Sequence, residues 1–331
     1  MAQVKLHPAA YADKPEDVTL FDPSINSLNE GDAIIQHYCN TVLREIFSHH
    51  NTIHIPTHCI PDEKQLSALS HSATKIVCGT NLMTPHYEEF SNWKIPYNLA
   101  SYRNIVTFGV GWGYYCDDIS PASRFVYNTI LSKDMLHSVR DSYTESKFRE
   151  MGFANVVNTG CPTLWGLTPE ACSAIPQGKS RNVITTLTDY ARDEQLDIRM
   201  FQILHKHYEN VYVWVQGADD MEYLRQLTDL SALKTIPRSF DAYTEALKMG
   251  DVDYVGTRLH AGIHAMNMGV RSIILAVDNR AIEMGRDFNM PVLQRKNLED
   301  NLEKMILDSW HTSISLPSKQ IQAWKNQFSA I

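Results

Sequence analysis

The chain has 331 residues, of which 44% are hydrophobic and 21% charged, and its formal net charge is −8. This length suits two domains with a core each, and the composition is that of a folded globular protein rather than a low-complexity chain. The negative charge and the absence of a dense Lys/Arg run exclude nucleic acid as an expected partner.

The sequence predicts no membrane-spanning segment and no secretory signal. No stretch is apolar over the roughly 18 residues that a bilayer requires, and the N-terminal MAQVKLHPAAYADKPEDV lacks both a basic and an apolar region. We therefore expect a cytoplasmic protein, and peripheral contact with the inner face of a membrane stays compatible with the sequence. The six cysteines are scattered and are expected to be reduced, without a zinc or redox pair.

Short β-rich runs alternate with helical stretches in two rounds, which predicts parallel sheets flanked by helices. The strongest helix is predicted over GDAIIQHYCNTVLREIF. The first round has the strands TIHI, TKIVCG, NIVTFGVG, MLHSV and NVVNTG, with helices at DEKQLSALSHS and SYTESKFREMG. The second round has the strands RNVITTL, NVYVWVQG, LKTIP, VDYVGT and RSIILAV, then the terminal helices NLEDNLEKMILDSW and SLPSKQIQAWKNQFSAI.

The stretch between Gly160 and Arg181 contains three prolines and two glycines and has little periodicity, which is typical of a linker. It predicts one domain over residues 1–170 and a second over 181–331, with the packing of the terminal helix on the first domain left open. Two such sheets facing each other across a cleft would direct strand ends and helix N-termini at a ligand, which favours an anion.

The loop SINSLNEGDAII precedes the strongest helix, and three of its residues suit a helix start or a close ligand contact. Asn29 and Asp32 favour helix N-termini, and Gly31 permits close approach of the backbone. Two interpretations stay open: an ordinary loop and N-cap, or a loop at the cleft that touches the donor or the acceptor.

The segment TFGVGWGYYCDD interleaves three glycines with aromatic residues after a predicted strand. The glycine spacing differs from that of the dinucleotide-binding fingerprint. Trp112 and Tyr114 could stack on a sugar or pack in the core. Asp117 and Asp118 are interpreted as exposed turn acids rather than a metal-binding pair.

Arg140 lies at the end of the predicted strand MLHSV, just before a helix that Ser142 or Thr144 could cap. One interpretation places Arg140 in the cleft as an anion ligand. The other is a surface arrangement of Arg140 with Asp141 and an ordinary helix cap.

Arg258 and His260 lie at the junction of a predicted strand and a helix that begins near Leu259. An arginine fork can bind a carboxylate or phosphate, and a neighbouring histidine can transfer a proton near neutral pH. The alternative is an ion pair of Arg258 with a nearby carboxylate and a satisfied interior His260. His264 shares the helix face, but the glutamate of the zincin motif is missing after His260, so no metal site is predicted.

In this order the segments resemble the polysaccharide pyruvyltransferase family, over about residues 26–293. The resemblance is carried by NEGD, IVCGTN, TFGVGWG, VRD followed by Ser142, GCPTLW, and TRLHAG followed by GVRSIIL. The chain departs from the family at Cys78-Gly79-Thr80, where a glycine triplet is common, and at Cys161-Pro162, where Asp-Pro is common. We assign no role to these two positions.

The resemblance implies a GT-B-like α/β fold, in which two Rossmann-type domains face each other across a cleft, with the acceptor on the first domain and the donor on the second. It implies phosphoenolpyruvate as co-substrate, no cofactor, and a sugar acceptor with two suitably spaced hydroxyls, whether free, lipid-linked or polymeric. His260 and Arg258 would be catalytic, and the donor site would comprise Arg258, Leu259, His260 and Arg140. Acceptor or cleft contacts would come from Asn29, Gly31, Asp32, Trp112 and Tyr114.

In this scheme Arg258 and Arg140 hold the two anionic groups of the donor, while His260 acts as general acid or guides the departure of phosphate. Two rival functions stay open. One is a GT-B glycosyltransferase that uses a nucleotide sugar, because a fold alone does not determine chemistry. The other is an inactive sugar-binding partner of another transferase. The acceptor sugar and the oligomeric state are not indicated by the sequence.

Overall fold

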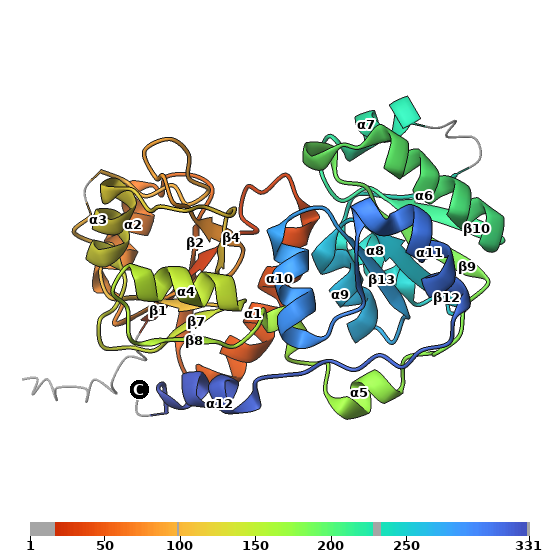
Figure 1. The fold of residues 1–331 in the computed structure, drawn as a ribbon. Helices are drawn as coiled ribbons and strands as arrows, with labels where there is room; N and C mark the ends of the chain where they lie inside the picture. The colour runs from red at the N-terminus through yellow and green to blue at the C-terminus, as the bar shows by residue number, and fades with distance from the viewer. Residues whose placement is uncertain (1–16, 98, 228–232, 330–331) are drawn as a thin grey trace, which may run out of the picture.

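A computed structural model describes residues 17–97, 99–227 and 233–329 of the chain. The N-terminal segment discussed above lies almost wholly outside these residues, as does the end of the last predicted helix segment. The described chain forms two lobes, each built on a parallel sheet with helices packed on it, as the sequence predicts (Figure 1). No helix in the described ranges is long and apolar enough to cross a membrane. All six cysteines are free thiols, as predicted.

The N-terminal lobe contains a four-stranded parallel sheet with the order β2-β1-β3-β5. Its strands are β1 (Asp17–Asp22), β2 (Asn51–Pro56), β3 (Thr74–Cys78) and β5 (Ile105–Phe108). Two short parallel pairs accompany it, β4 (Asn81–Met83) with β6 (Gly111–Trp112) and β7 (His137–Val139) with β8 (Val156–Asn158). The helices are α1 (Glu30–Ile46), α2 (Glu63–His71), α3 (Pro121–Ile130) and α4 (Ser142–Glu150).

The C-terminal lobe contains a six-stranded parallel sheet with the order β11-β10-β9-β12-β13-β14. Its strands are β9 (Asn182–Thr185), β10 (Asn210–Trp214), β11 (Lys234–Ile236), β12 (Val252–Gly256), β13 (Ser272–Ala276) and β14 (Val292–Gln294). The helices are α6 (Glu194–His207), α7 (Asp220–Leu227), α8 (Phe240–Leu247), α9 (Leu259–Asn267), α10 (Asn279–Phe288) and α11 (Leu298–Leu307). The central strands β12 and β13 are buried along their whole length, as expected for a parallel sheet covered on both faces.

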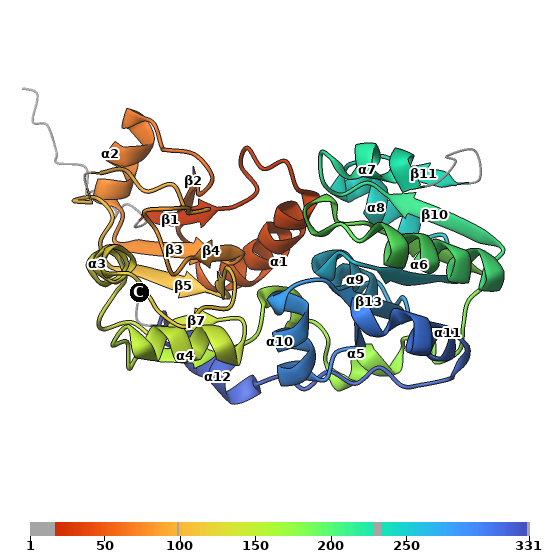
Figure 2. The same ribbon diagram turned by 45° about the horizontal axis from the view of Figure 1, so that its top comes forward.

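Helix α1 lies between the lobes and contributes to both cores (Figure 2). Ile34 belongs to the core of the C-terminal lobe, whereas Ile35 and Cys39 pack in the core of the N-terminal lobe. Tyr38 reaches further into the C-terminal lobe, where its hydroxyl lies 2.8 Å from Nδ1 of His264. Burial on two faces explains the apolar residues from which the sequence predicts this helix.

The chain passes from the first sheet to the second through the predicted linker, which contains the short helix α5 (Pro169–Ser173). After α11 it returns to the N-terminal lobe and ends in α12 (Ser318–Asn326), which lies beside that lobe in Figures 1 and 2. Trp324 of α12 is fully buried. Its ring stacks on Phe108 with 4.3 Å between centroids, and its indole N–H donates to the Thr107 carbonyl oxygen.

Candidate functional site

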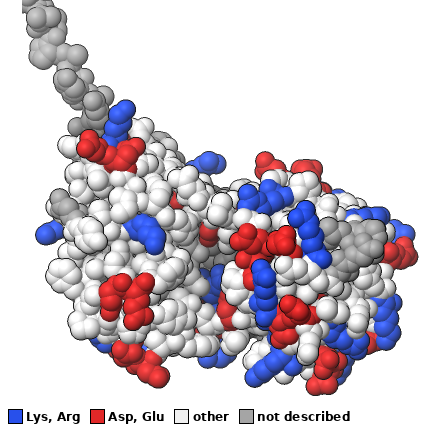
Figure 3. Space-filling model, turned by 90° about the horizontal axis from the view of Figure 1, so that it is seen from above, with Lys and Arg blue, Asp and Glu red and all other residues white. Residues whose placement is uncertain are grey.

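A cleft of about 530 Å³ opens between the lobes, at the carboxyl ends of the strands of both sheets. Figure 3 shows this region as a groove with acidic and basic side chains on its floor. The cleft is lined mainly by the N-terminal lobe, through Asn26, Ser27, Leu28, Asn29, Asp32, His58, Thr80, Asn81, Phe90 and Asn92. The described lining residues of the C-terminal lobe are Tyr190 and Arg280. The position agrees with the rule that α/β proteins bind ligands beyond the carboxyl ends of their strands.

His260 lies in the first turn of α9, which starts directly after β12 as the sequence predicts. The N-cap residue Arg258 makes no side-chain cap bond, so the first-turn N–H groups of α9 are left for a ligand. The His260 side chain is buried, and its Nε2 lies 3.7 Å from Sγ of Cys161. Burial, followed by the charges of Arg140 and Arg280, lowers the pKa of His260 well below its ordinary value. The free protein therefore holds a neutral imidazole at this position at pH 7.

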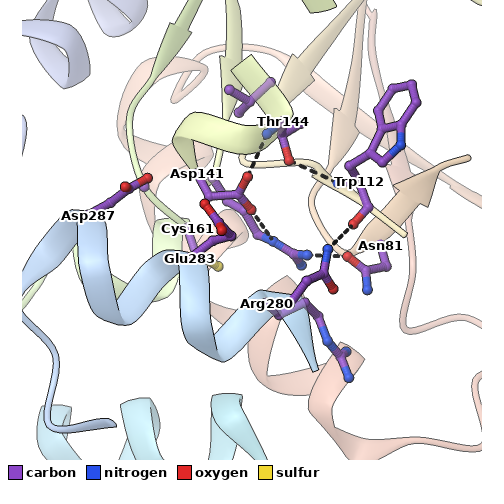
Figure 4. A network of polar contacts seen from close by, with 12 residues as sticks. Asn81, Trp112, Asp141, Thr144, Cys161, Arg280, Glu283 and Asp287 are labelled. Atoms are coloured by element: carbon purple, nitrogen blue, oxygen red, sulfur yellow. Dashed lines mark hydrogen bonds and ion pairs between the residues drawn. The ribbon is translucent and has the colours of Figure 1, made fainter. Parts of the chain in front are cut away.

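Arg140 follows β7 and is fully buried. Its Nε lies 3.3 Å from Oδ2 of Asp141, and Nη2 binds the side-chain oxygen of Asn81 (Figure 4). Its Nη1 has no hydrogen-bond partner among the described residues. A buried N–H without a partner is costly, so an anion is the natural ligand for this nitrogen. Gly111 makes room for the guanidinium, since a Cβ there would lie 2.1 Å from Cζ of Arg140.

The predicted cap of the helix after Arg140 is wrong. Asp141 is the N-cap of α4, because its Oδ1 accepts from the backbone N–H of Thr144 at 2.7 Å. Asp141 is also buried, so the interpretation of a surface arrangement with Arg140 fails as well. The pair instead lies inside the molecule, next to the contact of the two lobes. There Asn279 of α10 donates to the carbonyl oxygen of Trp112 (Figure 4).

Arg280 lines the cleft from the first turn of α10. Asp278 is the N-cap of that helix and accepts from Nε of Arg280 at 2.9 Å. The hydroxyl of Tyr190 accepts a further bond from the Arg280 guanidinium. Although burial opposes ionisation, Arg280 and Arg140 lower the pKa of Asp278. Arg140 of the N-terminal lobe and Arg280 of the C-terminal lobe thus both lower the pKa of His260. Of these three residues, only Arg280 is among the described residues that line the cleft, and Arg140 and His260 lie buried behind it.

The side chain of Arg258 binds groups of its own lobe. Its Nε donates to the Leu187 carbonyl oxygen at 2.8 Å, and Nη2 binds both Asp189 and Asp220. Its guanidinium carbon lies 5.1 Å from the centre of the Tyr190 ring. This is the ion pair of the alternative interpretation, and Arg258 does not belong to the described lining of the cleft.

The loop before α1 both caps that helix and lines the cleft. Asn29 is the N-cap of α1, since its side chain accepts from the Gly31 N–H at 3.1 Å. Asn29 and Asp32 also line the cleft. The loop is held to the other lobe by Gln216, whose side-chain amide donates to Oδ1 of Asn29 at 2.8 Å.

Three predicted contacts are not supported by the positions of the side chains. Trp112 is fully buried against Tyr127 and so cannot stack on a sugar. Leu259 belongs to the core of the C-terminal lobe, which leaves only its backbone N–H for a donor. Tyr114 is partly exposed but is not among the described residues that line the cleft.

His264 is an interior histidine with both ring nitrogens engaged. Nδ1 contacts the Tyr38 hydroxyl, and Nε2 lies 3.0 Å from the Thr244 hydroxyl. Burial lowers its pKa to about 4. In the described part of the chain, no group of three or more His, Cys, Asp or Glu side chains has an arrangement that could hold a metal ion.

Arg280, Tyr190 and His58 line the cleft, although the sequence does not predict them as site residues. A signal for Arg280 was present, because DNR follows the strand RSIILAV in the same strand-to-helix context as Arg258. Tyr190 has no comparable signal, since the order of β9, β12 and β13 in the sheet brings it to the site. His58 follows β2 in a loop without a recognisable motif.

The family model for polysaccharide pyruvyl transferase matches residues 29–279 of this chain. No curated protein matches the chain in sequence. Among solved structures, it is similar to the UDP-GlcNAc 2-epimerase of Methanocaldococcus jannaschii in complex with UDP-GlcNAc and UDP, with a TM-score of 0.53 and 11% identity over 96% of this chain and 99% of that chain. It is also similar to the MnaA protein of S. aureus with UDP, with a TM-score of 0.50 and 11% identity over 96% and 98%. These likenesses concern the fold, which is GT-B-like as predicted.

Proposed function

This chain belongs to the polysaccharide pyruvyl transferase family, and from that premise we propose that it transfers pyruvyl from phosphoenolpyruvate to a sugar and forms a pyruvate ketal. The observation that carries the proposal is the group around His260. This histidine lies at an uncapped helix N-terminus, close to two arginines from opposite lobes. Such a site suits a small ligand with two anionic groups.

Phosphoenolpyruvate has a carboxylate and a phosphate, and the site has matching donors for both. Nη1 of Arg140 is buried without a partner, and Arg280 faces the cleft from the other lobe. The first-turn N–H groups of α9 supply further donors. Arg258 acts indirectly in this scheme, because it fixes Asp189 and so the loop that carries Tyr190.

The reaction requires a proton on the methylene carbon of the donor, which leaves positive charge on the neighbouring carbon. A sugar hydroxyl attacks that carbon, the bond to the phosphate oxygen breaks, and a second hydroxyl of the same sugar closes the ketal ring. The two hydroxyls release two protons, which balance the proton added to carbon and the one that leaves with phosphate. His260 is neutral in the free protein. The negative donor offsets the arginine charges, raises the pKa of His260 and allows it to hold the proton that it delivers.

The cleft favours a small donor over a nucleotide sugar. Only Tyr190 and Arg280 of the described C-terminal lobe line it, whereas a nucleotide donor needs a pocket for a base and a ribose. The N-terminal wall is rich in amide side chains and holds a 58% exposed Phe90. Amides and an exposed ring are groups that bind a sugar.

The test is incubation of the purified protein with phosphoenolpyruvate and a panel of p-nitrophenyl hexopyranosides. We expect phosphate release that depends on the acceptor, together with a product that carries the mass increment of a pyruvate ketal. Parallel reactions with UDP-hexoses should release no UDP. Release of UDP with glycoside formation, and none of phosphate, would replace the proposal by a glycosyltransferase function.

A further inference from the structure

Asp32 is the only carboxylate among the described residues that line the cleft. It lies in the first turn of α1, and its side chain is 8% exposed. Oδ2 accepts a hydrogen bond from the Ser27 hydroxyl at 2.7 Å and faces Nε2 of His58 at 3.5 Å. Oδ1 receives no hydrogen bond from the described residues. This oxygen is therefore left for a hydroxyl group of a ligand in the cleft.

The backbone fixes the orientation of the His58 ring. Nδ1 lies 3.1 Å from the carbonyl oxygen of Asn92, and because a carbonyl oxygen only accepts, Nδ1 carries a proton. Nε2 is buried and has no hydrogen-bond partner among the described residues. In the neutral ring, the lone pair of Nε2 therefore points toward the Asp32 carboxylate, ready to accept a proton from it.

We propose that Asp32 is the base that removes the proton from an acceptor hydroxyl, and that His58 stores this proton on Nε2. The inference rests on the proposed function and assigns the acceptor half of the reaction. As the hydroxyl oxygen bonds to the donor carbon, its proton moves to the Asp32 carboxylate, and Asp32 then passes this same proton to the free Nε2 of His58. The stored proton later leaves with the phosphate or returns to solvent. Asp32 would be a catalytic residue, and His58 a positioning residue that acts through it.

The surrounding residues indicate that the ligand class is a pyranose. Phe90 exposes an aromatic face, and Asn26 and Asn92 place amide groups on the same wall of the cleft. A pyranose ring can lay its apolar face on the phenyl ring while its hydroxyls reach the amides and Asp32. This assigns to Phe90 the stacking role that the buried Trp112 cannot take.

The pair makes the rate depend on pH in a defined direction. Burial lowers the pKa of His58, but Asp32 and the hydrogen bond to the Asn92 carbonyl oxygen together more than offset this, so that the pKa of His58 is raised above its ordinary value. Lys94, in the loop after β4, acts in the opposite direction. His58 can store the proton only if its ring is neutral at the start of the reaction. Turnover should therefore rise as the pH increases through the pKa of His58.

The experiment measures phosphate release from phosphoenolpyruvate with the p-nitrophenyl hexopyranosides between about pH 5 and 9. For Asp32→Asn we expect turnover to fall on the order of 10² to 10⁴-fold, while phosphoenolpyruvate still raises the unfolding temperature. His58→Gln should abolish the acidic limb of the pH profile. Lys94→Gln should move that limb to higher pH, because it removes the charge that lowers the pKa of His58.

The matched control is His207→Gln, which removes a histidine paired with Glu303 in the other lobe and should leave the profile unchanged. An unaltered acidic limb in His58→Gln, or near-normal turnover in folded Asp32→Asn, would overturn the inference while the proposed function stands. A wild-type protein that releases no phosphate with any hexoside would overturn both. If Asp32→Asn does not fold, the other two variants still test the inference. The acidic limb of the pH profile should be lost in His58→Gln and should move to higher pH in Lys94→Gln.

Discussion

Replacing Gly111 by alanine should misplace Arg140 without changing any charge. The added Cβ would lie 2.1 Å from Cζ of Arg140 and 2.3 Å from its Nε and Nη2, whereas ordinary contacts begin near 3.4 Å. The guanidinium must therefore move by more than about 1 Å, and a misplacement of this size typically costs about 10² in rate. We expect kcat/KM for phosphoenolpyruvate to fall about 100-fold, which corresponds to about 2.7 kcal/mol of transition-state stabilisation.

The matched control is Gly113→Ala in the same segment. Its Cβ would lie 3.3 Å from the carbonyl oxygen of Met83 and would meet no catalytic group, so kcat/KM should stay within about twofold of wild type. Both variants are compared in the phosphate-release assay and by thermal unfolding. A folded Gly111→Ala variant with near-normal kcat/KM would refute the role of Arg140 as a donor ligand. Equal losses in the two variants would assign the effect to the β-strand rather than to the arginine.

Four further outcomes follow from the buried charges and histidines. His260→Ala should leave a folded protein whose turnover is lower by about 10² to 10⁴, and near-normal activity would remove His260 from the mechanism. Calorimetry in buffers of different ionisation enthalpy should detect proton uptake when phosphoenolpyruvate binds, since the donor raises the depressed pKa of His260; binding without uptake would contradict this. Arg258→Gln should lower the free energy of unfolding by about 3 kcal/mol, because it leaves the buried Asp220 without its cationic partner; an unchanged unfolding temperature would contradict this. Burial lowers the pKa of His137 to about 4, so the unfolded state binds more protons between pH 6.5 and 4. As the pH decreases through this window, the free energy of unfolding should fall by up to about 1.4 kcal/mol per pH unit. Denaturant titrations of His137→Gln should show a free energy of unfolding that depends less on pH than that of the wild type.

Much of the fold is predictable because its main elements are long or deeply buried. Helix α1 is apolar on two faces, and the central strands of the second sheet are continuous buried runs. Strand β1 was not predicted, although it is central in its sheet, because DVTLFD has an aspartate at each end and follows a polar segment. Strand β14 is only three residues long and has no period to detect.

The site is predictable only where chemistry coincides with a strand-to-helix junction. The neighbourhood of His260 was found in this way, and so was the loop that carries Asp32. Sheet order and lobe packing decide the rest. They place Tyr190 beside Arg280, and they direct Trp112 into the core because β6 pairs with β4. Spacing along the sequence contains no information about such contacts.

The burial of Trp324 affects the order in which the two lobes can fold during translation. The N-terminal lobe lacks part of its interior until α12 has been synthesised, since α12 supplies the ring that covers Phe108. The second lobe contains all of its own strands and can mature earlier. A chain that stops before α12 therefore leaves the N-terminal wall of the cleft without part of the core behind it.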